Sequence, residues 1–66
     1  MPQTEFSSSG FQVSFYYSRD NEYKIGLISQ PSIIGKSFQE THNILERYRH
    51  FLAFVSDKLN ELNNDN

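Results

Sequence analysis

Apolar and polar residues alternate along the N-terminal half of the chain. Apolar side chains take every second position on both sides of the polar stretch Arg19-Asp20-Asn21; they are Phe11, Val13, Phe15 and Tyr17, then Tyr23, Ile25 and Leu27. A period of two places alternate side chains on one face of a strand. The pattern therefore predicts an antiparallel β-hairpin with one apolar face.

The register of this hairpin follows from its apolar face, because directly opposed residues lie on the same face of a sheet. The pairs that keep the face together are Tyr17 with Tyr23, Phe15 with Ile25, and Val13 with Leu27. This register leaves residues 19–21 as a three-residue loop, whose last position favours a left-handed residue such as Asn21. The other face should be mostly polar and open to water or a partner; it carries Gln12, Ser14, Tyr16, Lys24, Gly26 and Ile28.

Along the C-terminal half, apolar residues recur at steps of three and four without an interrupting Gly or Pro. They are Ile44, Tyr48, Phe51, Leu52, Val55, Leu59 and Leu62. Ser37 lies three residues before Glu40, the spacing of a capping box, in which each side chain binds an otherwise unpaired backbone N–H group at a helix start. We therefore predict one helix from about Phe38 to about Leu62.

These elements predict an α+β fold, ββ(β)α, in which the hairpin packs on one long C-terminal helix. Pro31 ends the second strand, and Ile33 and Ile34 could form a short third strand. A single domain should span residues 11–62. Residues 1–10 are polar and Ser-rich, and residues 63–66 are only Asn and Asp, so we expect both segments to be flexible tails.

The predicted helix is longer than the predicted sheet. At 1.5 Å per residue the helix is roughly 35 to 40 Å long, whereas strands of ~7 residues span about 20 to 25 Å. We expect the excess to lie around residues 55–62, where Val55, Leu59 and Leu62 would have nothing in their own chain to cover them. This mismatch predicts a homodimer through the C-terminal helix, or a complex with another protein.

Composition supports pairing and narrows the remaining possibilities. A chain of 66 residues has a small core, and without cysteine it has no disulfide to stabilise it. Six Lys and Arg against eight Asp and Glu give a net charge of −2, so nothing attracts the whole chain to nucleic acid or to an anionic membrane. No positively charged and apolar leader and no membrane-spanning apolar run is present, so we expect a cytoplasmic protein.

The two arginines of the stretch ILERYRHF (residues 44–51) lie on opposite sides of the predicted helix, about 160° apart at 100° per residue. Arg47 shares its side with Phe54 and Lys58. One interpretation is that both arginines lie over the edges of the apolar stripe. The other is that Arg47, Phe54 and Lys58 bind a partner, since Phe54 falls outside the stripe and aromatic residues and arginine are enriched in interfaces.

Two patterns suggest other chemistry, and neither has the residues and spacing that this chemistry requires. His42, Glu46 and His50 follow one another at steps of four, which separates the two imidazoles by about 12 Å, too far for one metal ion. Residues 35–37 (GKS) resemble the end of a phosphate-binding loop, but Gln30 stands where that signature requires glycine. No Cys and no Ser-His-acid arrangement is present, so we expect no enzyme, no metal and no cofactor.

Two short segments resemble known families. RYRHFLAF (residues 47–54) resembles the arginine-tyrosine segment of phosphoinositide-binding PX domains, which implies contact with a lipid headgroup, although Glu46 stands where that family tends to have a second basic residue. GKSFQE (residues 35–40) after a hairpin is similar to the partial RNase-H-like layout of HicB-type antitoxins, which implies an antitoxin-like role.

The sequence thus favours a small non-enzymatic protein-interaction or regulatory module. It would act as a homodimer or as a stoichiometric inhibitor or adaptor of a larger protein, as phage and mobile-element inhibitors and antitoxins do. The candidate partner-binding residues are Arg47, Phe54, Lys58, Tyr16, Lys24, Val55, Leu59 and Leu62. The alternative is binding of nucleic acid or anionic lipid through Tyr16, Lys24 and Arg19 of the hairpin with Arg47 or Arg49, which salt would weaken steeply.

Overall fold

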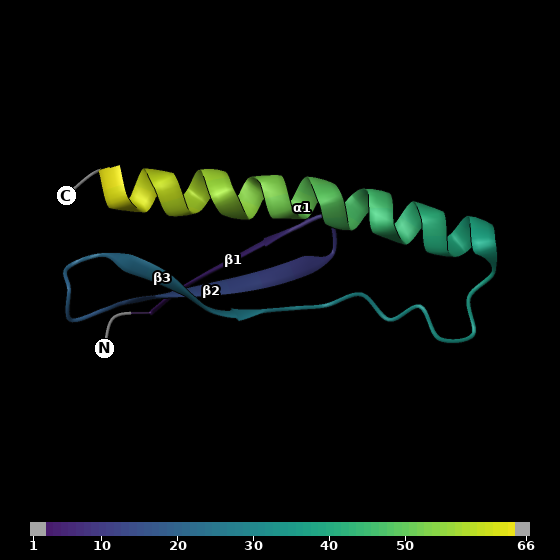
Figure 1. Cartoon of the computed structure of the whole chain (residues 1–66), viewed down its shortest axis with the longest axis horizontal. Coiled ribbons are helices and arrows are strands. Elements are labelled where there is room, and N and C mark those ends of the chain that lie inside the picture. The colour runs from purple at the N-terminus through teal and green to yellow at the C-terminus, as the bar shows by residue number, and fades with distance from the viewer. Residues whose placement is uncertain (1–2, 65–66) are drawn as a thin grey trace.

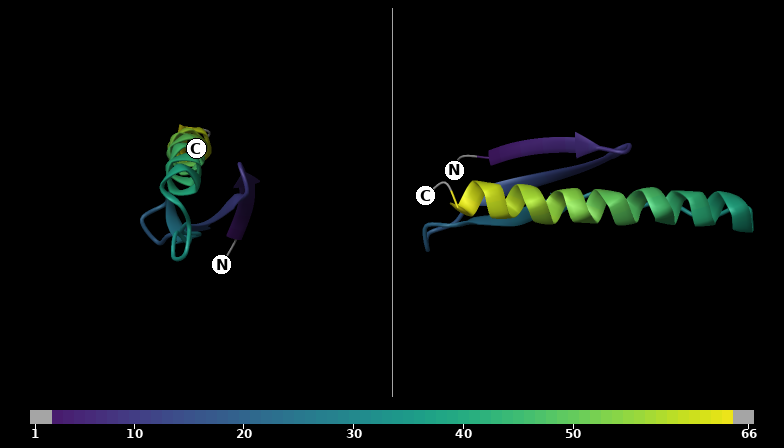
Figure 2. Two further views of the ribbon diagram at one scale, coloured as in Figure 1. Left: turned by 90° about the vertical axis from the view of Figure 1, so that its right-hand side faces the viewer. Right: turned by 90° about the horizontal axis from the view of Figure 1, so that it is seen from above.

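The computed structural model describes residues 3–64, which form one three-stranded antiparallel sheet and one helix lying along one face of it (Figures 1 and 2). The elements are β1 (Gln3–Ser8), β2 (Phe11–Tyr17), β3 (Tyr23–Ile28) and α1 (Phe38–Asn64). The strands follow the order β1-β2-β3, so β2 is central and the other two are edges. The predicted α+β class and the long C-terminal helix are confirmed.

The third strand of the sheet is β1, and the prediction of a flexible tail over residues 1–10 is wrong for residues 3–8. β1 pairs with β2 in a register that sets Phe6 opposite Val13. A two-residue turn joins these strands, with Ser9 at φ 57° and Gly10 at φ 84°, the two positive angles that a tight hairpin turn requires. Ile33 and Ile34, where a third strand seemed possible, lie in the connection between β3 and α1.

The predicted β2–β3 hairpin is confirmed near its loop. Tyr17 pairs with Tyr23 and Phe15 with Ile25. Asn21 has a positive φ of 66°, and the Ser18 N–H group donates to the Glu22 carbonyl at 2.9 Å, which closes the loop over residues 19–21.

Beyond Ile25 the predicted register is wrong, because a β-bulge shifts β3 by one residue. Val13 pairs with Ile28 instead of Leu27, and Leu27 turns to the outer face, where it is 74% exposed. The Leu27 N–H group donates to the buried Ser14 Oγ at 3.1 Å. Gly26 suits the bulge, since a Cβ atom there would lie 3.3 Å from Ser14 Oγ.

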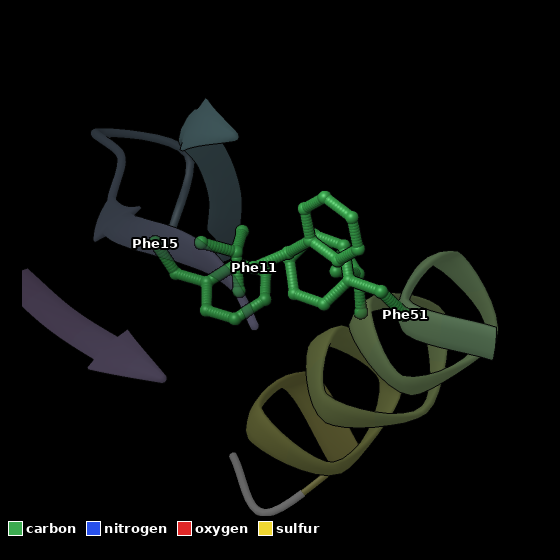
Figure 3. Packing of buried hydrophobic residues seen from close by; sticks show 5 residues of the cluster. Phe11, Phe15 and Phe51 are labelled. Atoms are coloured by element: carbon green, nitrogen blue, oxygen red, sulfur yellow. The ribbon is translucent and has the colours of Figure 1, made fainter. Parts of the chain in front are cut away.

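The core lies between the central strand and the middle of the helix (Figure 3). Its buried side chains are Phe11, Val13 and Phe15 of β2, with Phe51 and Val55 of α1. The rings of Phe11 and Phe51 are 5.5 Å apart between centroids. Among the residues predicted for the core, Ile25, Leu27 and Leu52 are exposed instead. Ile25 lies on the edge strand β3, and the bulge turns Leu27 to the outer face.

Both ends of α1 are fixed by side-chain hydrogen bonds. At the start, the Glu40 N–H group donates to Ser37 Oγ at 3.1 Å and the Ser37 N–H group donates to Glu40 Oε1 at 3.0 Å, which confirms the predicted capping box. At the other end, Asn63 Oδ1 accepts from the Tyr23 N–H group at 2.6 Å and its amide donates to the Tyr23 carbonyl at 3.2 Å. Residues 63 and 64, predicted to be a tail, therefore belong to the helix; residues 65–66 lie outside the described residues.

The helix does extend past its sheet, but at the end opposite to the one predicted. Figure 1 shows the C-terminal half of α1 over the strands and its N-terminal end beyond them, above the connection from β3. The longest dimension of the molecule is 43 Å, close to the length of the helix at 1.5 Å per residue. Val55, expected in the uncovered part, is only 3% exposed.

Candidate interaction surfaces

The predicted partner-binding side of the helix contains Phe54, which packs within the molecule. Its ring meets Phe6 of β1 at 6.3 Å between centroids and stacks on Phe51 at 6.4 Å. The position of Phe54 outside the apolar stripe, which suggested an interface, is thus explained by β1. The strand was not predicted, so the residue that it covers seemed to lack a partner.

Lys58 and Arg47 extend from this side of the helix over aromatic rings. Lys58 Nζ lies 5.4 Å from the ring centre of Phe6 and 3.4 Å from Glu61 Oε1. Arg47 lies over Phe11, with Cζ 5.9 Å from the ring centre. Both contacts favour a cation over an aromatic face, which matches the interpretation that these side chains lie over the edges of the core.

The hairpin face holds the next two candidates, Tyr16 and Lys24. Lys24 Nζ lies 3.0 Å from Asp20 Oδ2 and 3.9 Å from Glu22 Oε1. The hydrogen bond to Asp20 raises the pKa of Lys24, while Ser18 and Lys24 lower the pKa of Asp20. Two carboxylates therefore lie close to the positive charge of Lys24 and partly neutralise it. The alternative function, phosphate binding, requires this charge.

The last three candidates belong to the region that the sheet covers. Val55 is buried, while Leu59 and Leu62 are half-buried and pack against the core. The eight predicted residues are therefore not brought together at one place. They divide among the β1 side of the helix, the outer hairpin face and the edge of the core.

A surface that was not predicted runs along α1, and we call Phe38, Leu45 and Leu52 the exposed row. These side chains are 86%, 45% and 43% exposed, and they follow one another at steps of seven residues. Seven residues fall about 20° short of two helical turns, so such a row runs almost parallel to the helix axis. Leu59, seven residues further on, continues the row and is half-buried.

The spacing of the exposed row was visible in the sequence. Leu52 and Leu59 were assigned to the core stripe, and Phe38 and Leu45 were left outside it, so the four were never considered together. A search for period seven in addition to steps of three and four would have found the row. That Leu52 is exposed, whereas its neighbour Phe51 is buried, is shown only by the structure.

The remaining motifs take structural positions. Within residues 3–64 no three His, Asp or Glu side chains lie close enough together to hold a metal ion, and Glu46 is 3.2 Å from Arg49 Nη1. Ser37 of the GKS stretch serves as the helix cap. The segment that resembles PX domains lies inside α1, where Tyr48 packs on Phe11 at 5.1 Å.

Comparison of the chain with protein-family models, with curated proteins and with solved structures finds no match. In the part of the chain that the structure describes, no helix is both long and apolar enough to cross a membrane.

Proposed function

We propose that this protein is a non-enzymatic interaction module that acts as a homodimer, with the exposed row of α1 in the dimer interface. The observation that carries the proposal is the regular spacing of three large, exposed apolar side chains on one side of a helix that extends beyond its sheet. Contiguous exposed apolar surface marks sites of association. A repeat of seven suits packing against another helix.

The spacing of the row favours a second copy as the occupant. Phe38, Leu45, Leu52 and Leu59 are symmetric about a point between residues 48 and 49. An antiparallel second helix would therefore bring Leu45 opposite the second copy's Leu52, and Phe38 opposite the second copy's Leu59. The same surface on both chains then forms a closed two-fold interface.

Charge and size agree with this arrangement. The ion pair between Glu46 and Arg49 lies beside the midpoint of the row. In a two-fold dimer centred there, the two chains would bring together two neutral ion pairs instead of two unpaired like charges. Within residues 3–64, only five apolar residues are buried in the core, which is little for a stable single domain. Pairing along the exposed row would cover Phe38, Leu45 and Leu52, which the sheet leaves exposed.

The test is the mass of the protein in solution, measured by sedimentation equilibrium over a range of concentrations. We expect the unmodified protein to sediment at twice the 7.8 kDa mass of the chain, and Leu45→Glu to sediment as a monomer with unchanged helical circular dichroism. Leu27→Glu is the matched control, because Leu27 is also exposed but lies on the outer sheet face. We expect that variant to remain a dimer.

A monomeric unmodified protein at submillimolar concentration would overturn the homodimer, as would a Leu45→Glu variant that still dimerises. If the protein is monomeric and a larger host protein binds it, with Leu45→Glu abolishing the complex, the stoichiometric inhibitor or adaptor role replaces the homodimer. The protein would then still be an interaction module, and its exposed row would bind a host protein instead of a second copy of the chain.

A further inference from the structure

A hollow of about 460 Å³ lies beneath the overhanging part of α1, between the helix, the β1–β2 turn and the connection that follows β3. Its walls combine apolar and basic side chains. Phe11, Ile34 and Ile44 supply the apolar surface, and Lys36 and Arg47 supply two positive charges. Ile34 is 91% exposed, so a ligand in the hollow would cover apolar surface that the chain leaves open.

The charge of the hollow is opposite to that of the chain. No described Asp or Glu side chain borders it, although the net charge of the protein is −2. Lys24, Arg49 and Lys58 each form an ion pair, whereas within residues 3–64 neither Lys36 nor Arg47 does. Lys36 is near enough to Glu40 to help lower its pKa, but that carboxylate already accepts the hydrogen bond of the helix cap.

The guanidinium group of Arg47 contacts an aromatic ring and no carboxylate within residues 3–64. Its Cζ atom lies over the Phe11 ring, 5.9 Å from the centre, and a cation–π contact uses none of the guanidinium N–H groups, which can still donate. Gly10 lies beside this group, since a Cβ atom at that position would be in ordinary van der Waals contact with Arg47 Nη1, at 3.8 Å. A guanidinium with unused N–H donors suits a carboxylate, which it can bind through two parallel hydrogen bonds.

We infer that this hollow binds an acidic peptide segment of a partner protein that also carries aliphatic side chains. One carboxylate accepts hydrogen bonds from Arg47, Lys36 attracts a second acidic group, and an aliphatic side chain packs against Ile34 and Ile44. The apolar walls favour such a peptide over an isolated phosphate group, which would leave them uncovered. The site is separate from the exposed row, since Arg47 projects about 200° around the helix from Leu45.

The experiment is a titration of the ¹⁵N-labelled full chain, followed by NMR chemical shifts. The probe is an acetylated and amidated tetrapeptide of alternating glutamate and leucine, and the reference peptide has glutamine in place of glutamate. We expect the acidic peptide to shift the amides around Gly10, Lys36 and Arg47 and to bind roughly tenfold more tightly than the reference, since hydrogen bonds to charged groups are stronger than those between neutral groups.

Two variants with the same charge change separate this site from general attraction. Arg47→Gln should weaken binding of the acidic peptide roughly tenfold, whereas Arg19→Gln, in the loop at the opposite end of the sheet, should leave it unchanged. Equal loss in both variants, equal binding of the two peptides, no binding at all, or tighter binding of inorganic phosphate or anionic phospholipid vesicles would overturn the inference. Sedimentation of the same variants reports the dimer separately, so the two proposals can fail independently.

Discussion

The two halves of α1 share one amphipathic pattern but differ in what covers them. In the C-terminal half, Phe51 and Val55 are buried against the sheet. In the N-terminal half, Ile44 of the same apolar stripe is only half-buried, and Phe38 at the helix start is 86% exposed. The difference teaches that the pattern of this helix is continuous, whereas burial along it is decided by how far a three-stranded sheet reaches.

The largest expected contrast is between one aromatic residue from each half. Phe51→Ala removes a fully buried ring from the core and should lower the free energy of unfolding by about 3 to 5 kcal/mol. Phe38→Ala removes an exposed ring and should change it by less than about 0.5 kcal/mol. Urea unfolding followed by circular dichroism measures both changes, at concentrations too low for association.

If both variants lost the same amount of unfolding free energy, the overhanging half of the helix would be as well covered as the half on the sheet. In a chain of this size, Phe51→Ala could abolish folding altogether, and that outcome also separates it from Phe38→Ala. At concentrations that favour association, Phe38→Ala should weaken the proposed dimer while leaving the fold of each chain intact.

The features of the fold that were predicted correctly are those determined by residues close together in the sequence. The Ser37–Glu40 cap, the left-handed Asn21 and the first pairs of the β2–β3 hairpin each follow from side chains a few positions apart. Strand β1 was missed because Phe6 is its single large apolar residue, so no period of two is visible there. The Ser9-Gly10 turn was the available signal, since glycine tolerates the positive φ that this turn requires.

The covered end of the helix could not be predicted because it depends on the course of a connection and on one contact between residues far apart in the sequence. The connection of nine residues, 29–37, continues away from the sheet before α1 turns back over it (Figure 1). Asn63 then fixes the last turn of the helix to Tyr23 at the start of β3. A run of Asn and Asp at the C-terminus resembles a tail in the sequence, and only the fold gives one of its side chains a backbone partner.

The second prediction removes this distant contact. Asn63→Ala deletes an acceptor and a donor that bind both backbone groups of Tyr23, and should cost about 1 to 3 kcal/mol. Asn60→Ala is the matched control, because Asn60 is an exposed residue of the same type on the same helix and should cost less than about 0.5 kcal/mol. Urea unfolding gives the free energies.

Hydrogen exchange at the Tyr23 amide gives a local measurement of the same contact. Exchange should accelerate in Asn63→Ala and stay slow in Asn60→Ala, since only the first variant exposes this N–H group at the edge of the sheet. If exchange at Tyr23 is the same in both variants, Asn63 does not hold the covered half of the helix in place.

The smallest expected effect concerns the first turn of the overhanging half, which the capping box stabilises without help from the sheet. The backbone hydrogen bond from Ser37 lowers the pKa of Glu40. A carboxyl group whose pKa is lower in the folded than in the unfolded chain stabilises the fold above the unfolded value. This contribution is lost as the pH falls through the folded value. Glu40→Gln should therefore reduce stability near neutral pH and leave it unchanged in strong acid, where Glu40 is protonated in both states.

The measurement is the difference in unfolding free energy between the unmodified protein and Glu40→Gln, followed from neutral pH to strong acid. The difference isolates Glu40, because Asp20, whose pKa is also lowered, is present in both proteins. A difference that persists unchanged into strong acid would show that the ionised carboxylate does not stabilise the helix start. The helix start would then depend on neutral hydrogen bonds such as that from the Glu40 N–H group to Ser37 Oγ, whereas the expected pH dependence means that the negative charge of Glu40 adds to them.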